Sequence, residues 1–280
     1  MPHAAVNGVD LLYEVTGAGV PLIFSHEYAG DARSWEPQVR FFSRFYRCVT
    51  YNHRGFPPST VPSDPAAYSL EILVEDLAAL LDHLGLAGPV HLVGLAMGGS
   101  VALHFALRSP ERCRSLVVAA TGSGTGDAEA YQQKNLQVIE LLATRGMRAY
   151  AEAHALEPTR IQLRHKDPRG WLEFREQLAS HSAEGAALTR QGVQGRRPPL
   201  TALQERLSAL AVPTLIVAGD EDTPCLQPAL FLKRAIPAAG LAMFPRTGHT
   251  INLEEPALFN RVVLDFLHAV EAERWRPVTA

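Results

Sequence analysis

Residues 92–99 read LVGLAMGG, and this stretch decides the fold. The apolar run VHLV at 90–93 is typical of a buried strand, and GGSVALHFALR at 98–108 is typical of a helix. Glycines lie on both sides of Ala96, at positions 94, 98 and 99. Small residues are needed there because a strand and a helix joined by a sharp turn pass close together. The pattern therefore predicts a tight strand-to-helix turn with Ala96 at its tip.

Two kinds of site use such a turn. In the nucleophile elbow, G-x-S-x-G, the tip residue carries the attacking atom, and the N–H groups after it point to where negative charge develops. A dinucleotide-binding turn has the fingerprint G-x-G-x-x-G, and Gly94-Leu95-Ala96 does not supply its first half. The elbow is the better match, although the methyl group of Ala96 is no nucleophile.

Strand and helix patterns alternate along the first 120 residues. The apolar, β-branched runs are Pro21–Ser25, Cys48–Tyr51, Val90–Val93 and Ser115–Ala119. The segments with helical spacing of apolar residues are Ser34–Arg44, Ser69–Leu84 and Gly98–Arg108. This alternation predicts parallel strands covered by helices on both faces. An earlier pair, Ala5–Val6 and Leu11–Val15 around Asn7-Gly8, predicts a hairpin.

A long helical stretch interrupts this alternation. It shows no strand pattern and is rich in helix formers and charges. Strand patterns return at Pro213–Gly219 and Leu241–Phe244, and a final helix is predicted at Pro256–Glu271. The expected α/β fold therefore has a core of residues 1–124 and 207–280 and a helical insertion of residues 125–206.

Composition and charge exclude several partners. The 280 residues carry a formal net charge of −3 without a block of Lys or Arg, so no nucleic acid partner is expected. Arg196-Arg197 is predicted to be a solvated turn. No apolar run reaches about 18 residues, which predicts no membrane span. The first ten residues lack the pattern of a secretory signal, so we expect a cytoplasmic protein.

The cysteines and histidines predict no metal site. Cys48, Cys113 and Cys225 are too few and too scattered for a disulfide framework or a zinc site. Cys48 and Cys113 lie in or beside apolar strand-like runs and are expected to be small core residues. Because no cluster of His, Asp and Glu has metal-ligand spacing, neither a metal nor a cofactor is expected.

These motifs together resemble the α/β-hydrolase family. The sequence GLAMGG at 94–99 is similar to the G-x-S-M-G-G elbow of members with a serine nucleophile. The family's chain order of nucleophile, acid and base implies His249 as the base, since Gly248-His249 is followed by Glu-x-Pro at 254–256. The acid is implied in Gly-Asp-Glu-Asp at 219–222, where Asp222 matches the family pattern and Asp220 is the alternative. The implied catalytic positions are Ala96, Asp222 and His249.

The resemblance also implies an oxyanion hole. Its two N–H groups would come from Met97, after the tip, and from Tyr28, in the loop after the first parallel strand. Glu27 stands where the family commonly has glycine. We expect Glu27 to point outward as a loop charge, with a polar selector inside the substrate pocket as the alternative. His26 is expected to brace this loop. Asn52, in a stretch similar to the family's D-x-R-G-x-G-x-S turn, is given no catalytic role.

The helical insertion lies where the family carries its cap, so it is expected to roof the pocket for a small-molecule substrate. Aromatic and histidine side chains of the insertion are candidates to bind that substrate: Trp171, Phe174, His154 and His181. A homodimer is left open, because the final helix can pack its apolar side chains on the sheet or on a second subunit.

Three explanations compete for Ala96. The first is a serine hydrolase of a carboxylic ester, lactone or related acyl bond whose nucleophile has been replaced, leaving a chain that binds substrate without turning it over. The second is a natural pseudo-hydrolase that binds a ligand. The third is a non-hydrolytic enzyme, a lyase or cofactor-free oxygenase, that uses the Asp222–His249 dyad as a base. The first is favoured, because a strained turn with its acid and base in place has a chemical reason only if a nucleophile belongs there.

Overall fold

The computed structural model describes residues 1–122 and 128–277. Within them, eight strands form one sheet in the order β1-β2-β4-β3-β5-β6-β7-β8, and all strands from β4 to β8 in that order run parallel. The strands are β1 His3–Val6, β2 Val9–Thr16, β3 Pro21–Ser25, β4 Arg47–Tyr51, β5 Val90–Leu95, β6 Cys113–Ala119, β7 Thr214–Gly219 and β8 Ala239–Phe244. The predicted α/β class is confirmed, and every predicted strand overlaps an observed one, with ends that differ by at most two residues.

The antiparallel edge of the sheet is the predicted hairpin. Val6 pairs with Val9, so Asn7 and Gly8 alone form the turn between β1 and β2. Both have positive φ, 46° and 76°. A two-residue hairpin turn of type I′ requires this conformation, which Asn-Gly adopts readily.

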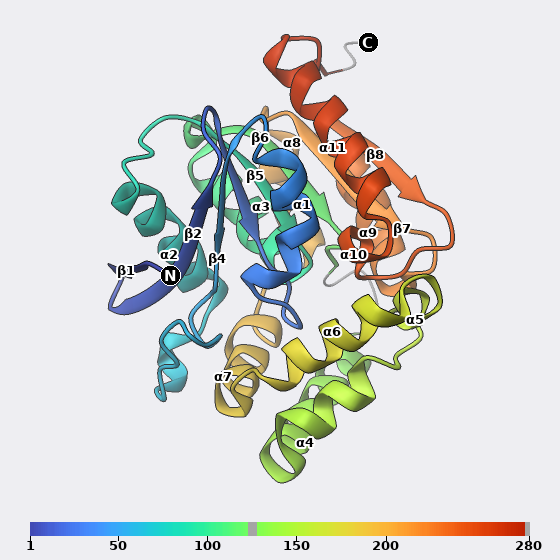
Figure 1. Cartoon of the computed structure of the whole chain (residues 1–280). Coiled ribbons are helices and arrows are strands. Elements are labelled where there is room, and N and C mark those ends of the chain that lie inside the picture. Colours follow the sequence, from blue (N-terminus) through green and yellow to red (C-terminus); the bar gives the residue numbers. More distant parts are fainter. Residues whose placement is uncertain (123–127, 278–280) are drawn as a thin grey trace.

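Helices cover both faces of the sheet (Figure 1). The core helices are α1 Glu36–Phe42, α2 Leu70–His83, α3 Met97–Arg108, α9 Thr223–Ala235, α10 Ile251–Glu254 and α11 Pro256–Glu271. On one face, Phe259 and Phe266 of α11 pack with Phe42 of α1 against the strands. On the other face, Leu73 and Leu77 of α2 belong to the larger core that α3 and α9 share. The apolar side of α11 is thus buried on the chain's own sheet.

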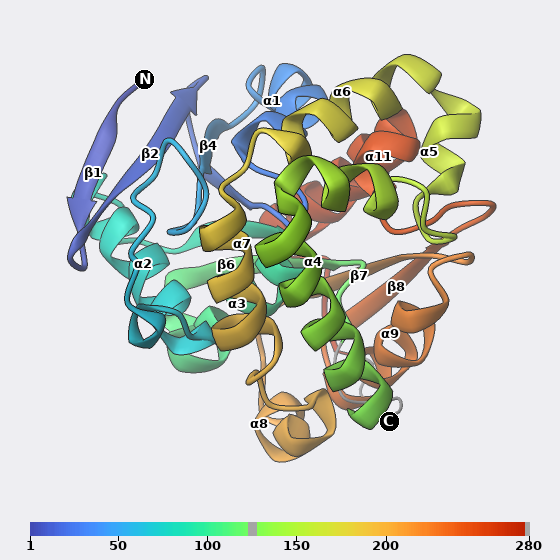
Figure 2. The same ribbon diagram turned by 90° about the horizontal axis from the view of Figure 1, so that it is seen from below.

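The insertion between β6 and β7 is helical. Its helices are α4 Ala128–His154, which is broken at Gly146, then α5 Ile161–Lys166, α6 Pro168–Ala179, α7 Ala183–Thr189 and α8 Gln204–Ser208. Figure 1 shows α4 to α7 grouped at one end of the sheet, and Figure 2, seen from that end, shows α4 and α7 lying across the strands. The predicted start of the insertion, residue 125, lies outside the described residues. Over the parts of the chain that the structure covers, no helix has both the length and the apolarity to cross a membrane.

Candidate active site

Ala96 occupies a strained turn between β5 and α3. Its backbone angles are φ 49° and ψ −105°, a conformation that non-glycine residues rarely adopt. The glycines around it are required by space. A Cβ on Gly98 would lie 2.0 Å from the backbone oxygen of Ser25, and one on Gly94 would lie 2.3 Å from that of Gly98. The predicted strand-to-helix turn is therefore present, with the Ala96 methyl group at a cavity.

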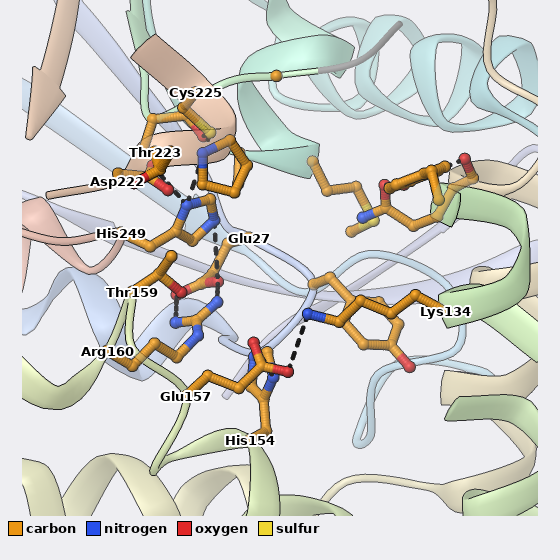
Figure 3. Close-up of a pocket in the computed structure, with 18 of the residues that line it drawn as sticks. Glu27, Lys134, His154, Glu157, Thr159, Arg160, Asp222, Thr223, Cys225 and His249 are labelled. Carbon is orange, nitrogen blue, oxygen red and sulfur yellow. Dashed lines mark hydrogen bonds and ion pairs between the residues drawn. The ribbon is translucent and has the colours of Figure 1, made fainter. Parts of the chain in front are cut away.

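A hydrogen-bonded carboxylate and imidazole face this cavity. His249 Nδ1 donates to Asp222 Oδ2 at 2.7 Å, and Asp222, just after β7, is 1% exposed (Figure 3). Asp220 instead accepts a hydrogen bond from the backbone N–H of Thr247 at 3.2 Å. Of the two aspartates, Asp222 is therefore the one placed to orient His249.

The loop that carries His249 is fixed from both sides. The Glu254 carboxylate accepts hydrogen bonds from the backbone N–H of Gly248 at 2.6 Å and from the hydroxyl of Thr250 at 2.9 Å. The backbone N–H of His249 donates to the carbonyl of Thr159, in the insertion, at 2.7 Å. Burial alone would lower the pKa of His249, but the charge and hydrogen bond of Asp222 raise it above its ordinary value.

The loop after β3 lies against the start of α3. His26 is fully buried, and its Nε2 accepts from the backbone N–H of His53 at 3.0 Å. The ring proton is therefore on Nδ1, which donates to the carbonyl of Glu27 at 2.7 Å. Burial lowers the pKa of His26 to about 4, so the ring is neutral at pH 7 and braces the loop as expected. Tyr28 and Met97, which are expected to supply the N–H groups of an oxyanion hole, both line the cavity.

Glu27 does not point outward, which corrects the sequence-based expectation. It is 2% exposed and lines the cavity, with Oε2 3.9 Å from His249 Nε2. Arg160 binds both carboxylate oxygens, at 3.0 and 2.5 Å. Burial by itself would raise the pKa of Glu27, but the Arg160 guanidinium lowers it to about 2. The Glu27 carboxylate, which was expected at the surface, is therefore buried, because Arg160 of the insertion supplies its counter-charge.

Arg160 and Thr159 were not anticipated. They follow Pro158 between α4 and α5, more than 130 positions after Glu27. No short motif marks them. Only Glu27 could have indicated a residue such as Arg160, because a carboxylate that enters a pocket needs a cation nearby.

The cavity has a volume of about 470 Å³ and lies between the core and the insertion. Charged side chains occupy much of its wall: Glu27, Lys134, Glu157, Arg160, Arg190, Arg197, Glu221 and Asp222. His154 lines it as predicted, with its ring stacked on Tyr150 at 5.0 Å. The cavity therefore combines charged side chains with apolar ones such as Ala96, Met97 and Pro224.

Trp171 and His181 do not line this cavity, contrary to expectation. Trp171 packs inside the insertion, where its Nε1 donates to the carbonyl of Ala155 at 2.8 Å. His181 Nε2 lies 3.0 Å from Asp31 Oδ2, so it joins the insertion to the core. Phe174 lies beneath the guanidinium of Arg160, 5.3 Å away. Trp171 and Phe174 are thus held inside the insertion, and His181 is held against the core.

The Arg196-Arg197 turn is only half solvated. Arg196 is exposed, whereas Arg197 lines the cavity and donates to the carbonyl of Gly122 at 2.6 Å and to Ser100 Oγ at 3.2 Å. The prediction of a solvated turn is therefore wrong for Arg197.

The cysteines are free and buried. Cys48 and Cys113 are core residues, as predicted, but Cys225 lies beside the dyad, with Sγ 3.8 Å from His249 Nδ1. Asp222, Cys225 and His249 together offer three donors that could hold a metal ion. However, burial raises the pKa of the Cys225 thiol well above its ordinary value, and His249 Nδ1 is engaged by Asp222.

Residues 20–256 match the family described as the alpha/beta hydrolase fold. The chain belongs to this family. It is 31% identical to a protein of Variovorax paradoxus named as a carbamate hydrolase (RutD), with 94% of this chain and 97% of that protein aligned. It is 28% identical to 3-oxoadipate enol-lactonase 2 of Acinetobacter baylyi, over 90% of this chain and 87% of that protein.

Solved structures agree with this membership. The enol-lactonase of Burkholderia xenovorans LB400 has a TM-score of 0.85 and 26% identity, covering 95% of this chain and all of that one. A thermophilic esterase from Thermogutta terrifontis has a TM-score of 0.84 and 28% identity, covering 96% and 98%. This hydrolase has relatives that are named for lactone and ester substrates.

Proposed function

We propose that this site is that of a serine hydrolase acting on a carboxylic ester, lactone or related acyl bond, with position 96 as the nucleophile position. The observation that carries the proposal is the Asp222–His249 hydrogen bond of 2.7 Å beside the strained turn at Ala96. The relatives named as enol-lactonases, esterases and carbamate hydrolases support an acyl bond as the target.

In the active form a serine hydroxyl at position 96 attacks the acyl carbon. His249 Nε2 takes the hydroxyl proton, and Asp222 holds the ring through Nδ1. The N–H groups of Tyr28 and Met97 stabilise the negative oxygen that forms. His249 then gives its proton to the leaving alcohol. In the second half of the reaction it activates the water that releases the acid.

With Ala96 the chain has no atom to form the acyl intermediate. We therefore propose that it binds substrate and turns it over negligibly. Loss of a triad member typically lowers turnover by about 10³- to 10⁶-fold, while the pocket and the oxyanion hole remain. The strained backbone of Ala96 supports a turn shaped for a reactive side chain.

The test is the hydrolysis of p-nitrophenyl acetate and butyrate by the Ala96 chain and by A96S. We expect A96S to gain about 10³-fold or more in kcat, to show a burst of p-nitrophenol, and to be labelled at position 96 by a fluorophosphonate. The double variant A96S/H249Q is the control and should lose this gain. If a folded A96S stays inactive and unlabelled, the proposal is overturned.

A dyad enzyme is the second candidate, because the Asp222–His249 hydrogen bond is intact in a chain that lacks the nucleophile. Such an enzyme would remove a proton from its substrate with His249 Nε2. It predicts that the Ala96 chain exchanges an acidic C–H proton of a bound ligand for deuterium and that H249Q abolishes this exchange, whatever A96S does.

A further inference from the structure

Arg190 is a buried cation that the proposed chemistry does not use. It lies in the π-helical turn after α7, is 9% exposed, and lines the cavity. Its guanidinium lies over the ring of Tyr28, 4.7 Å from the centroid. Its Nε has no hydrogen-bond partner, and no carboxylate among the residues that the structure describes forms an ion pair with Arg190.

The carboxylates of the cavity are already engaged. Glu27 is bound by Arg160, and Glu157 lies 3.1 Å from the Lys134 ammonium. Asp222 accepts from His249, as described above. Glu221 lies 3.2 Å from Arg246 and accepts from Gln162. None of these groups is left to neutralise Arg190.

Asn135 and Arg197 of the wall also have polar atoms without hydrogen-bond partners among the residues that the structure describes. Asn135 is 3% exposed, and neither its amide nitrogen nor its amide oxygen has a hydrogen-bond partner among the described residues. Arg197 bonds only to neutral oxygens, those of Gly122, Ser100 and Tyr131, and its Nε is unpartnered within the same described set. Both residues line the same cavity as Arg190 and Ala96.

Unpaired buried charge is costly, and buried polar atoms without partners are rare in native proteins. A cavity wall that holds two guanidinium groups without a counter-charge, and one amide without a hydrogen-bond partner, in the described part of the chain is complementary to a bound anion. Arg presents its donors as a planar fork that fits a carboxylate with two hydrogen bonds. The amide of Asn135 adds a neutral donor.

We propose that Arg190, with Asn135 and Arg197, binds a carboxylate of the substrate away from the bond that is cleaved. The substrate is then an anionic ester or lactone, such as a monoester of a dicarboxylic acid. This inference rests on the proposed function for the identity of the cleaved bond, but the anion site itself does not depend on catalysis.

Binding to the Ala96 chain tests the site without turnover. The probes are methyl butyrate and monomethyl succinate. Monomethyl succinate has a carboxylate where methyl butyrate has its terminal methyl group. Binding of each probe is measured by calorimetry. We expect monomethyl succinate to bind at least about tenfold more tightly, since hydrogen bonds to charged groups contribute that much or more. Inorganic phosphate is a third probe and should bind more weakly than monomethyl succinate.

The variants are R190Q, R190K and N135A, with R196Q as the matched control because Arg196 is the exposed arginine of the same segment. R190Q should weaken the binding of monomethyl succinate about 10- to 100-fold and leave the binding of methyl butyrate unchanged. The affinity of R190K for monomethyl succinate should lie between that of R190Q and that of the unsubstituted chain. R196Q should change nothing. Thermal unfolding checks that each variant is folded.

Equal binding of the two esters, or R190Q with native affinity for monomethyl succinate, overturns the anion site. Tighter binding of phosphate than of monomethyl succinate overturns the carboxylate assignment. If the R190Q effect is present but A96S hydrolyses neither ester, the anion site stands and the hydrolase proposal fails. If A96S hydrolyses both esters equally and R190Q does not change the ratio, the hydrolase stands and the anion site fails.

Discussion

Glu27 Oε2 lies 3.9 Å from His249 Nε2, so the imidazole lies between two carboxylates. Asp222 binds the Nδ1 edge, and Glu27 faces the edge that must accept a proton from the nucleophile. The family commonly has glycine in place of Glu27. A second carboxylate at this edge favours the protonated ring, and both carboxylates contribute to the raised pKa of His249.

Replacing Glu27 should therefore move the pH dependence of an active variant. The reaction needs neutral His249, so activity falls as the pH drops through the histidine pKa. Glu27 raises that pKa, and its removal must lower it. In the A96S background, E27Q should shift the acid limb of kcat/KM to lower pH. E173Q, at an exposed position, is the control. If the acid limb of kcat/KM stays at the same pH or moves to higher pH in E27Q, this account is contradicted.

Breaking the Glu27–Arg160 pair from one side should destabilise the fold. R160Q leaves a buried carboxylate without its counter-charge, at a cost of about 3–5 kcal/mol. The pKa of Glu27 is lowered to about 2, so its stabilisation is present above about pH 4.3 and is lost as the pH falls toward 2. The free energy of unfolding in urea at pH 7 measures the effect.

Two controls belong to that experiment. The double variant E27Q/R160Q removes both charges and should regain most of the loss. R261Q breaks the exposed pair between Arg261 and Asp265 and should cost no more than about 0.5 kcal/mol. A loss in R160Q no larger than that in R261Q would show that the buried pair contributes little.

Substitution of Asp222 should affect catalysis, whereas substitution of Asp220 should affect mainly stability. In the A96S background, D222N leaves His249 without its charged acceptor and should lower kcat by about 10⁴-fold. D220N replaces the charged acceptor for the Thr247 N–H with a neutral amide oxygen, so it should cost no more than about 1 kcal/mol of stability and keep kcat within about tenfold. Stopped-flow kinetics with p-nitrophenyl butyrate and urea unfolding of both variants distinguish these roles. Equal loss of kcat in the two variants is the contrary result.

Glycine at position 96 should relieve the backbone strain of this turn. With φ at 49°, Ala96 carries strain that glycine does not, so A96G should stabilise the chain by about 1 kcal/mol. A102G, in the regular part of α3, is the matched control and should destabilise by about 1 kcal/mol or more. Urea midpoints of the two variants should move in opposite directions. A destabilised A96G would mean that the turn carries no strain at this residue.

Much of the fold follows from local pattern. The helix α11 begins and ends at its predicted residues, and the N-cap of α2 is Ser69, whose hydroxyl accepts from the backbone N–H of Ile72. Period and turn chemistry are properties of short segments, and the Asn7-Gly8 hairpin is set by two residues. The positions of Asp222 and His249 could be predicted for a related reason, since each is tied to a motif of a few residues.

The interior of the pocket could not be predicted in the same way. Glu27 was expected to face solvent because a loop carboxylate is usually exposed, and its partner Arg160 lies 133 positions away. Trp171 and His181 were placed in the pocket for their residue type alone, but Trp171 of α6 packs inside the insertion, and His181, between α6 and α7, hydrogen-bonds to Asp31 of the core. Pairings between distant segments depend on tertiary packing, which no single stretch of sequence contains.

The hydrogen bond from the His249 N–H to the Thr159 carbonyl has a consequence for substrate entry. Thr159 and Arg160 are adjacent, and together they join the insertion to the histidine loop and to the loop after β3. An insertion that swings away to admit a substrate must break both links at once. While these links are broken, the His249 loop lacks its hydrogen bond to Thr159 and keeps those to Glu254, so we expect the base to be fully positioned only when the insertion is closed over the cavity.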